Sequence, residues 1–186
     1  FLIPVKVVDR DKYVEKDKNY VFVANHQGMF DIFIMYGYIH KRFKWIMKDT
    51  LRKMPLLGKA CHDTGHIFVN RETPQKDLLR NSIKTLKSGA SLGIFPEGTR
   101  CRNGKMGKFK KGAFVIANMA QKPVLPITID GAYDILPKGV PFISIPKDLQ
   151  PITSNAASHR PLATSGVSCL FIFVYSAQFS ITIFTL

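Results

Sequence analysis

The chain has 186 residues, and 46% of them are hydrophobic, which is enough for one domain with a buried core. Its formal charge of +14 indicates an anionic partner, either a nucleic acid or a phospholipid surface with phosphorylated substrates. The sign of the charge alone does not choose between them. Three cysteines, Cys61, Cys101 and Cys169, form no CxxC pair and have no His at metal-ligand spacing. This pattern argues against a disulfide framework and a structural zinc site, and it favours a reducing compartment.

The chain begins at Phe1 with a short apolar run that has neither the basic start of a signal peptide nor the length of a membrane span. We therefore expect a fragment that starts just upstream of its own first strand.

Strand and helix patterns alternate along the first 130 residues. The clearest helix opens at Thr73-Pro74, with Thr as the cap, Pro in the first turn and Gly89 as the stop. In chain order, the pattern predicts a strand at 20–24, a helix at 31–40, strands at 44–47 and 66–69, a helix at 73–89, a strand at 91–95, a helix at 112–121 and a strand at 124–129. Such alternation predicts an α/β fold, with a largely parallel central sheet and helices on both faces.

The run Asn-His-Gln-Gly-Met-Phe-Asp at 25–31 directly follows the first of these strands. His26 can take up a proton near neutral pH, and a carboxylate close by can fix its tautomer and stabilise the imidazolium. Residues five apart are not neighbours on a regular helix, so His26 and Asp31 meet only if the chain bends between them, which Gly28 favours. Alternatively, Asp31 caps the next helix and His26 is an incidental loop residue. Spacing alone leaves both possibilities open.

A second polar run, Phe-Pro-Glu-Gly-Thr-Arg at 95–100, stands at the end of the strand at 91–95. Residues 100–111 then hold six basic side chains and no acid. Interleaved glycines let backbone N–H groups approach a ligand, and a helix from Gly112 adds the positive end of its dipole. This pattern predicts a phosphate site, and a solvated basic loop is the alternative. Ligands gather at the carboxyl ends of parallel strands, so we expect both polar runs to form one site.

Together these residues resemble the glycerolipid acyltransferases, specifically the 1-acyl-sn-glycerol-3-phosphate (lysophosphatidic acid) acyltransferases. That family has four ordered motifs, and similar stretches occur here in the same order, over roughly residues 1–139. They are NHxxxxD at 25–31, Gly-His-Ile-Phe-Val-Asn-Arg at 65–71, Phe-Pro-Glu-Gly-Thr-Arg at 95–100 and Val-Leu-Pro-Ile at 124–127. The chain departs from the family at Gly28, where many members have Ser, and at Cys101, where Ser is common.

The resemblance implies the transfer of a fatty acyl group from acyl-CoA or acyl carrier protein to the free hydroxyl of lysophosphatidic acid, which yields phosphatidic acid. His26 would accept the hydroxyl proton, and Asp31 would hold the imidazole. A thioester is already activated, so we expect no metal and no cofactor besides the thioester co-substrate.

The resemblance also implies which residues bind the acceptor. The residues that would hold its phosphate and glycerol are Arg71, Glu97, Gly98, Thr99 and Arg100. Arg100 would contact the phosphate with both arms of its guanidinium. We expect the like-charged Glu97 to orient a neighbouring cation or the glycerol hydroxyls, and backbone N–H groups near Gly98 to face the oxyanion. Arg71 would lie on the same edge of the sheet if the strand at 66–69 is parallel.

Because substrate and product are lipids, we expect a phospholipid membrane surface as a partner and no nucleic acid. The expected location is the cytoplasmic face of a bacterial inner membrane or of the endoplasmic reticulum. In the family, membrane-anchoring helices precede the catalytic domain, so we expect an amino-terminal anchor to be missing here. Apolar and basic residues also alternate between residues 41 and 59, which suits an anionic interface. The apolar ones are Phe43, Trp45, Met47, Leu51, Met54, Leu56 and Leu57, and the alternative is that they belong to the core.

We place the catalytic domain at residues 1–145 and an atypical tail at 146–186, which is apolar from about residue 166. No charged residue occurs from Pro161 to Leu186. Three interpretations of the tail remain open: a membrane-spanning helix, strands packed on the domain, or an unrelated segment from a frame change or a chimeric gene model. The abrupt end of the similarity favours the last.

Other functions also remain open. A related acyltransferase that uses glycerol 3-phosphate or another lysophospholipid would share the first and third motifs. An inactive, truncated membrane protein is a more distant possibility. A nucleic-acid-binding module would explain the charge but would leave the pair of His26 and Asp31 unexplained.

Overall fold

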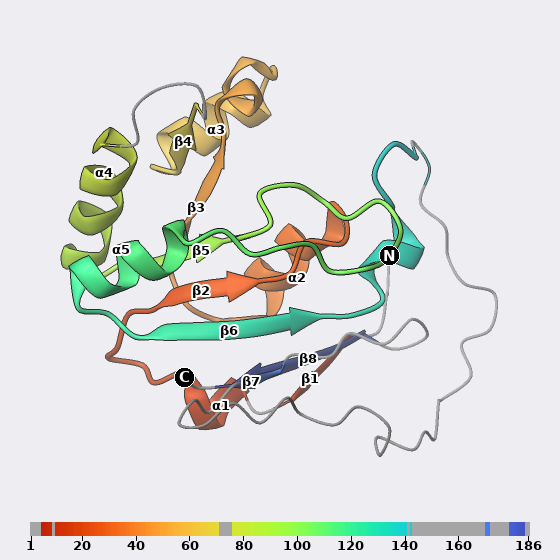
Figure 1. Cartoon of the computed structure of the whole chain (residues 1–186), viewed down its shortest axis with the longest axis horizontal. Coiled ribbons are helices and arrows are strands. Elements are labelled where there is room, and N and C mark those ends of the chain that lie inside the picture. The colour runs from red at the N-terminus through yellow and green to blue at the C-terminus, as the bar shows by residue number, and fades with distance from the viewer. Residues whose placement is uncertain are drawn as a thin grey trace.

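The computed structural model describes residues 5–8, 10–70, 76–140, 142, 170–171 and 179–184. The strands are β1 (Val5–Val8), β2 (Val21–Ala24), β3 (Phe43–Lys48), β4 (Ile67–Val69), β5 (Ser91–Ile94), β6 (Val124–Ile129), β7 (Leu170–Phe171) and β8 (Phe179–Phe184). The helices are α1 (Arg10–Tyr13), α2 (Phe30–Tyr38), the 3₁₀ helix η1 (Asp49–Lys53), α3 (Leu57–Asp63), α4 (Lys76–Lys87), α5 (Gly112–Ala120) and α6 (Ala132–Ile135). The strands form one sheet in the order β1-β8-β6-β2-β5-β3-β4, with β7 paired to β8 (Figure 1).

The middle of the sheet is parallel. The strands β6, β2, β5, β3 and β4 all run in the same direction, whereas β8 is antiparallel to β6 and parallel to β1. Every residue of β2 and β5 is buried, as expected for strands that are covered on both faces. The predicted α/β fold, with a largely parallel central sheet and helices on both faces, is confirmed.

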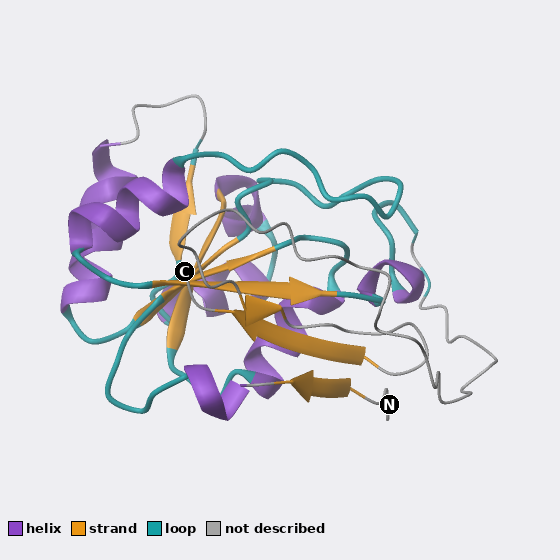
Figure 2. Ribbon diagram, turned by 60° about the horizontal axis from the view of Figure 1, so that its bottom comes forward, coloured by secondary structure: helices purple, strands orange, loops and turns teal. Residues whose placement is uncertain are grey.

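Two apolar clusters hold the helices against the sheet, one on each face (Figure 2). Successive side chains of a strand point to opposite faces, so β2 contributes Phe22 to one cluster and Val21 and Val23 to the other. The first cluster includes residues of α2 and α6, and the second includes residues of α4 and α5. A fully buried side chain such as Phe22 stabilises the fold by about 1.5–3 kcal/mol relative to an exposed one.

The predicted elements of the first 130 residues all form, with ends shifted by a few residues. The start of the predicted helix at 73–89 lies outside the described residues, and α4 is described from Lys76. Its apolar stripe faces the core as the spacing predicts, because Leu86 is fully buried and Leu79 and Ile83 pack against the same cluster. The shorter elements β1, α1, η1, α3 and α6 were not predicted, since four to seven residues carry too little periodicity to read.

The described residues of the tail are strands. The strand β8 pairs with both β6 and β1, and β7 pairs with β8. This agrees with the interpretation of strands packed on the domain. The domain boundary at residue 145 and the origin of the tail stay predictions. None of the helices in the described ranges combines the length and the hydropathy needed to cross a membrane.

The topology opens a crevice at one edge of the sheet. Strands β2 and β5 lie side by side, but the chain passes from β2 through α2 to β3, and from β5 through α5 to β6 on the other side. Because α2 and α5 cover opposite faces, the loops that follow β2 and β5 diverge. A crevice at the carboxyl ends of such strands is the usual ligand site of an open α/β sheet. Both predicted polar runs begin there.

Candidate active site

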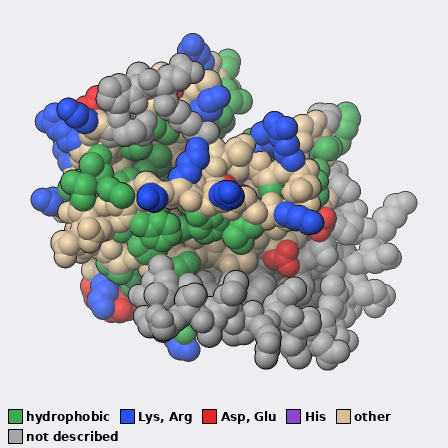
Figure 3. Space-filling view, viewed as in Figure 1, with side chains coloured by type: hydrophobic (Ala, Val, Ile, Leu, Met, Phe, Trp, Pro, Cys, Tyr) green, Lys and Arg blue, Asp and Glu red, His purple; other side chains and the backbone are tan. Residues whose placement is uncertain are grey.

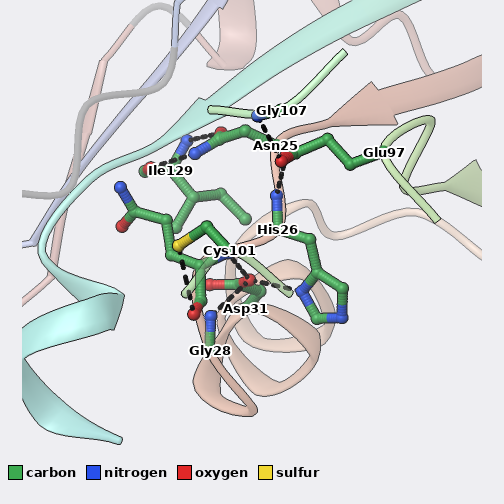
Figure 4. Close-up of polar contacts among 9 residues, drawn as sticks. Asn25, His26, Gly28, Asp31, Glu97, Cys101, Gly107 and Ile129 are labelled. Carbon is green, nitrogen blue, oxygen red and sulfur yellow. Dashed lines mark hydrogen bonds and ion pairs between the residues drawn. The ribbon is translucent and has the colours of Figure 1, made fainter. Parts of the chain in front are cut away.

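The bend after β2 brings His26 and Asp31 together. The Nδ1 atom of His26 lies 2.7 Å from Oδ2 of Asp31, and this oxygen also accepts the backbone N–H groups of Gln27 and Gly28 at 2.6 and 2.9 Å (Figure 4). The helix α2 begins at Phe30 and has no side-chain cap. The alternative that Asp31 caps the helix is therefore wrong, since its carboxylate binds groups that precede the helix.

Gly28 is required for a different reason from the one predicted. Its φ is not positive, so the bend does not depend on glycine's freedom at that angle. A Cβ atom at this position would instead lie 2.8 Å from the carbonyl oxygens of both Ala132 and Leu136. The absence of a side chain lets the loop after β2 pack against α6, which holds the bend in place.

This geometry assigns the proton of the imidazole. With Nδ1–H donated to the Asp31 carboxylate, Nε2 carries the lone pair that accepts a proton. Nε2 points away from Asp31 in Figure 4 and makes no hydrogen bond within the described part of the chain. Asp31 has no solvent exposure, and this burial raises the pKa of its carboxyl, while the hydrogen bond to His26 and the charge of that ring oppose the rise.

Aromatic rings hold the other side of the imidazole. The ring of His26 stacks on Phe95 with centroids 3.8 Å apart and planes 8° apart, and Phe95 stacks on Trp45 at 4.6 Å and 16°. Gly93 makes room for this stack, because a Cβ atom there would lie 2.8 Å from the Trp45 ring. The sequence analysis missed the stack. A glycine inside an otherwise apolar strand was the available signal, since it marks a close approach.

Glu97 links the two loops. One oxygen of its buried carboxylate accepts the backbone N–H of His26, and the other accepts the backbone N–H of Gly107, both at 2.7 Å (Figure 4). We expected Glu97 to orient a cation or the glycerol hydroxyls, but both of its oxygens bind backbone N–H groups. The N–H of Gly98 itself donates to the carbonyl of Phe95 at 2.9 Å. That backbone N–H groups near Gly98 face the oxyanion stays a prediction.

The basic loop, residues 100–111, runs along the crevice, and all of its cations except Arg100 are exposed. Arg100 is half-buried, and its guanidinium makes no hydrogen bond or ion pair with any other described residue. The hydroxyl of Thr99 accepts a hydrogen bond from Lys138 at 3.1 Å, which adds a cation that the sequence analysis did not identify. Arg71 lies outside the described residues. The expectation for Arg71 required the strand before it to be parallel, and β4 is parallel to β3.

Asn25 fixes the end of β2. Its side-chain amide donates to the carbonyl of Ile129 and accepts the N–H of the same residue, both at 2.7 Å. The buried amide thus continues the pairing of β2 with β6 by one residue, after which the chain bends into His26. The asparagine of the first motif has a structural role that its position in the sequence did not reveal.

A cavity of about 440 Å³ opens beside the imidazole and extends between the sheet, α4 and α5. Its polar and charged lining comes from His26, Lys48 and Lys110, and the first residues of α5 border it. The apolar lining residues are Ile32, Trp45, Ile46, Met47, Leu51, Val69, Leu78, Ile94, Phe95, Pro96, Ala113 and Ile116. An apolar cavity with a few polar groups fits a ligand with a hydrocarbon chain and a polar head.

Comparison with known proteins identifies the class to which this fold and site belong. The family model described as Acyltransferase matches residues 5–130. The chain belongs to this acyltransferase family, and the resemblance predicted from the four motifs is confirmed.

Two relatives are named for a specific reaction. The chain is 40% identical over 121 residues to a chloroplastic 1-acyl-sn-glycerol-3-phosphate acyltransferase of Arabidopsis thaliana, a match that covers 64% of this chain and 34% of that protein. It is 37% identical over 112 residues to the 1-acyl-sn-glycerol-3-phosphate acyltransferase of Helicobacter pylori, which covers 59% of this chain and 47% of that protein.

A solved structure has the same fold. The 1-acyl-sn-glycerophosphate (LPA) acyltransferase of Thermotoga maritima superposes with a TM-score of 0.65 at 36% sequence identity, over 74% of this chain and 55% of that one. The chain thus spans between 34% and 55% of the length of these three proteins.

Proposed function

We propose that the protein transfers a fatty acyl group from an acyl thioester to the free hydroxyl of lysophosphatidic acid, which gives phosphatidic acid. One observation carries the proposal: an imidazole, oriented by a buried carboxylate, lines a largely apolar cavity that Lys110 of the basic loop also lines. A lysophosphatidic acid has the matching parts, with a hydrocarbon chain, a nucleophilic hydroxyl and a phosphate. Relatives that share the fold are named for this reaction.

The chemistry follows from the hydrogen bonds of His26. Nε2 accepts the proton of the acceptor hydroxyl as its oxygen attacks the thioester carbonyl carbon, and the Asp31 carboxylate stabilises the imidazolium that forms. Collapse of the tetrahedral intermediate forms the ester and breaks the carbon–sulfur bond. The imidazolium then returns its proton to the leaving thiolate, so that the enzyme ends in its starting state. General base catalysis of this kind contributes about 10²–10⁴-fold.

The proposal also includes the acyl donor, the residues that bind the phosphate and the location of the reaction. Acyl-CoA and acyl carrier protein both present the required thioester, which needs no metal to activate it. The half-buried Arg100 and the exposed lysines of the basic loop would bind the acceptor phosphate, supported by the amino end of α5. Lipid substrates place the reaction at a phospholipid membrane surface, on the cytoplasmic face.

An acceptor panel tests the proposal. The protein is incubated with a long-chain acyl-CoA and, in separate reactions, lysophosphatidic acid, glycerol 3-phosphate or lysophosphatidylcholine, and the acylated products are quantified. We expect phosphatidic acid from lysophosphatidic acid, and a loss of about 10³-fold in the His26→Ala variant. A preference for glycerol 3-phosphate would instead support the related acyltransferase. Turnover that survives His26→Ala would refute the mechanism.

A further inference from the structure

The run of alternating apolar and basic residues between 41 and 59 divides into two parts in the structure. Phe43 and Trp45 are buried in the core, and Met47 and Leu51 line the cavity, whereas Met54, Leu56 and Leu57 protrude into solvent. Leu56 is 88% exposed, and Met54 and Leu57 are 45% and 44% exposed. These three side chains cluster where η1 meets α3, and we name residues 52–59 the apex.

We propose that the apex is a docking surface for an anionic phospholipid bilayer, with Met54, Leu56 and Leu57 inserted among the lipids and the neighbouring cations at the headgroups. The proposal rests on the proposed function in one respect only, in that the acceptor lipid would enter the cavity from the bilayer held there. Binding of vesicles by the apex can be measured without turnover.

The backbone conformation that exposes Leu56 to solvent is strained. Leu56 has φ 59° and ψ −58°, a positive φ that a residue with a Cβ atom adopts only under strain. The close packing of α3 on η1 imposes this angle. The N–H of Gly58 donates to the carbonyl of Met54 at 2.8 Å, and a Cβ atom at Gly58 would overlap the carbonyl oxygen of Arg52. Glycine would relieve the strain at position 56, so packing does not explain a leucine there.

The charges around the apex match an anionic surface. Arg52, Lys53 and Lys59 are all exposed, and no acidic residue occurs between Thr50 and His62. Arg52 pairs with Asp49 at 3.2 Å and Lys59 with Asp63 at 2.7 Å, at the two ends of this segment. Both pairs are at the surface, where such pairs contribute little and can exchange for lipid phosphates. Exposed apolar side chains flanked by lysine and arginine are the usual composition of an interfacial membrane contact. Figure 3 shows this mixture on the upper projection that carries α3 in Figure 1, where Lys or Arg atoms lie beside hydrophobic atoms.

The apex lies next to the opening of the cavity. Leu51 of η1 and Lys48 at the end of β3 both line the cavity that contains His26. A bilayer bound at the apex would therefore lie about one turn of η1 from the residues that line the cavity. A lysolipid could then move from the bilayer into the cavity without exposing its hydrocarbon chain to water.

Vesicle sedimentation tests the proposal. The protein is mixed with vesicles of phosphatidylcholine, or of phosphatidylcholine and phosphatidylglycerol in equal amounts, without substrates. We expect binding to the anionic vesicles that weakens with added salt, and a loss of about tenfold in the partition coefficient for the double variant Leu56→Ser with Leu57→Ser. Phe33→Ser is the matched control, because Phe33 is 63% exposed but belongs to α2 and not to the apex, and its loss should leave binding unchanged.

Two further variants separate docking from folding and from catalysis. Leu56→Gly adopts the positive φ without strain, so its thermal stability should not fall while its vesicle binding does. The His26→Ala variant should bind vesicles as the unchanged protein does, which keeps the docking result independent of the reaction. Equal vesicle binding by the Leu56→Ser/Leu57→Ser variant and the unchanged protein would overturn the proposal. An altered oligomeric state of that variant, with unaltered vesicle binding, would assign the apex to contact between copies of the chain and would overturn it as well.

Discussion

The loops that follow the neighbouring strands β2 and β5 carry different polar groups. The first loop fixes its polar side chains with hydrogen bonds, whereas the second leaves most of its cations in solvent. After β2, the side chains of Asn25, His26 and Asp31 are fixed by short hydrogen bonds, and those of Asn25 and Asp31 are buried. After β5, all the cations of residues 100–111 except Arg100 are exposed. Glu97 stands at the boundary and fixes the backbone of both loops.

The difference follows from what each loop has to do. Proton transfer requires the imidazole in one tautomer and one orientation, which a mobile side chain does not maintain. A phosphate is recognised by charge from several directions, and an exposed lysine needs no fixed geometry to supply it. Changes in the first loop should therefore affect turnover steeply. Changes in the second should affect acceptor binding mildly and depend on salt.

Asp31→Asn should produce the largest effect. The amide oxygen of Asn can take the place of Oδ2 and keep the three N–H bonds, so the fold and the tautomer persist while the negative charge is lost. Without that charge the imidazolium is less stable, and we expect kcat to fall by about 10²–10³-fold. Steady-state assays with saturating acceptor measure this. A loss below threefold would show that the charge of Asp31 is not needed.

The stability of the same variant, relative to that of the unchanged protein, should be greater at pH 7 than at pH 5. Burial raises the pKa of Asp31 in the folded state, so the ionised carboxylate costs folding free energy at pH 7, and Asn removes that cost. As the pH falls, the folded protein takes up a proton on Asp31 more readily than the unfolded chain does, and the cost diminishes. The Tm advantage of Asp31→Asn should therefore be largest at pH 7 and shrink towards pH 5. An advantage that grows on acidification would contradict the direction of the pKa shift.

Glu97→Gln should come next, because it breaks the link between the loops. A glutamine offers one acceptor oxygen where Glu97 has two, so either the N–H of His26 or that of Gly107 faces an amide donor. A buried donor left without a partner costs about 2 kcal/mol, which corresponds to about 30-fold in kcat/KM if it displaces the catalytic loop. The control is Glu15→Gln, whose carboxylate only pairs with Lys18 at the surface. Equal kinetics for the two variants would mean that Glu97 does not position the loop.

Phe95→Leu tests the stack that supports the imidazole. Leucine keeps the apolar volume but removes the π face on which the His26 ring lies, and with it the attraction to the imidazolium. We expect kcat to fall by about tenfold, an effect of ~1.4 kcal/mol, and KM to change little. Phe95→Tyr retains the ring and should recover most of the activity. If Leu and Tyr behave alike at this position, the ring has no role beyond filling space.

The sequence predicted those parts of the site that depend on position along the chain. The placement of His26 and Asp31 after one strand and of residues 95–100 after another was enough to join them, because parallel strands end at the same edge. What could not be predicted depends on which strands are neighbours. Trp45 lies opposite Gly93 in the pairing of β3 with β5, and this register creates the ring stack. No pattern within either strand contains that information.

The role of Glu97 was missed for a related reason. Its motif marks the residue as part of the site, and its charge suggested a polar substrate or a cation as its partner. Its partners are backbone N–H groups of residues 26 and 107, which every residue except proline carries, so no side-chain pattern announces them. The exposed position of Leu56 was equally hidden, since its strained φ arises from the packing of two short helices.

Arg100→Ala should have the smallest effect and should act on the acceptor alone. The guanidinium is half-buried at the start of the basic loop and lies outside the hydrogen bonds that hold His26. Since the other cations of the loop remain, we expect KM for lysophosphatidic acid to rise about fivefold at low salt, with kcat nearly unchanged. Arg102→Ala, in the same loop but fully exposed, is the matched control and should change KM less. A fall in kcat with constant KM would mean that Arg100 acts on turnover, as the residues of the fixed loop after β2 do. The proposed difference between positioned and solvated charges in this crevice would then be wrong.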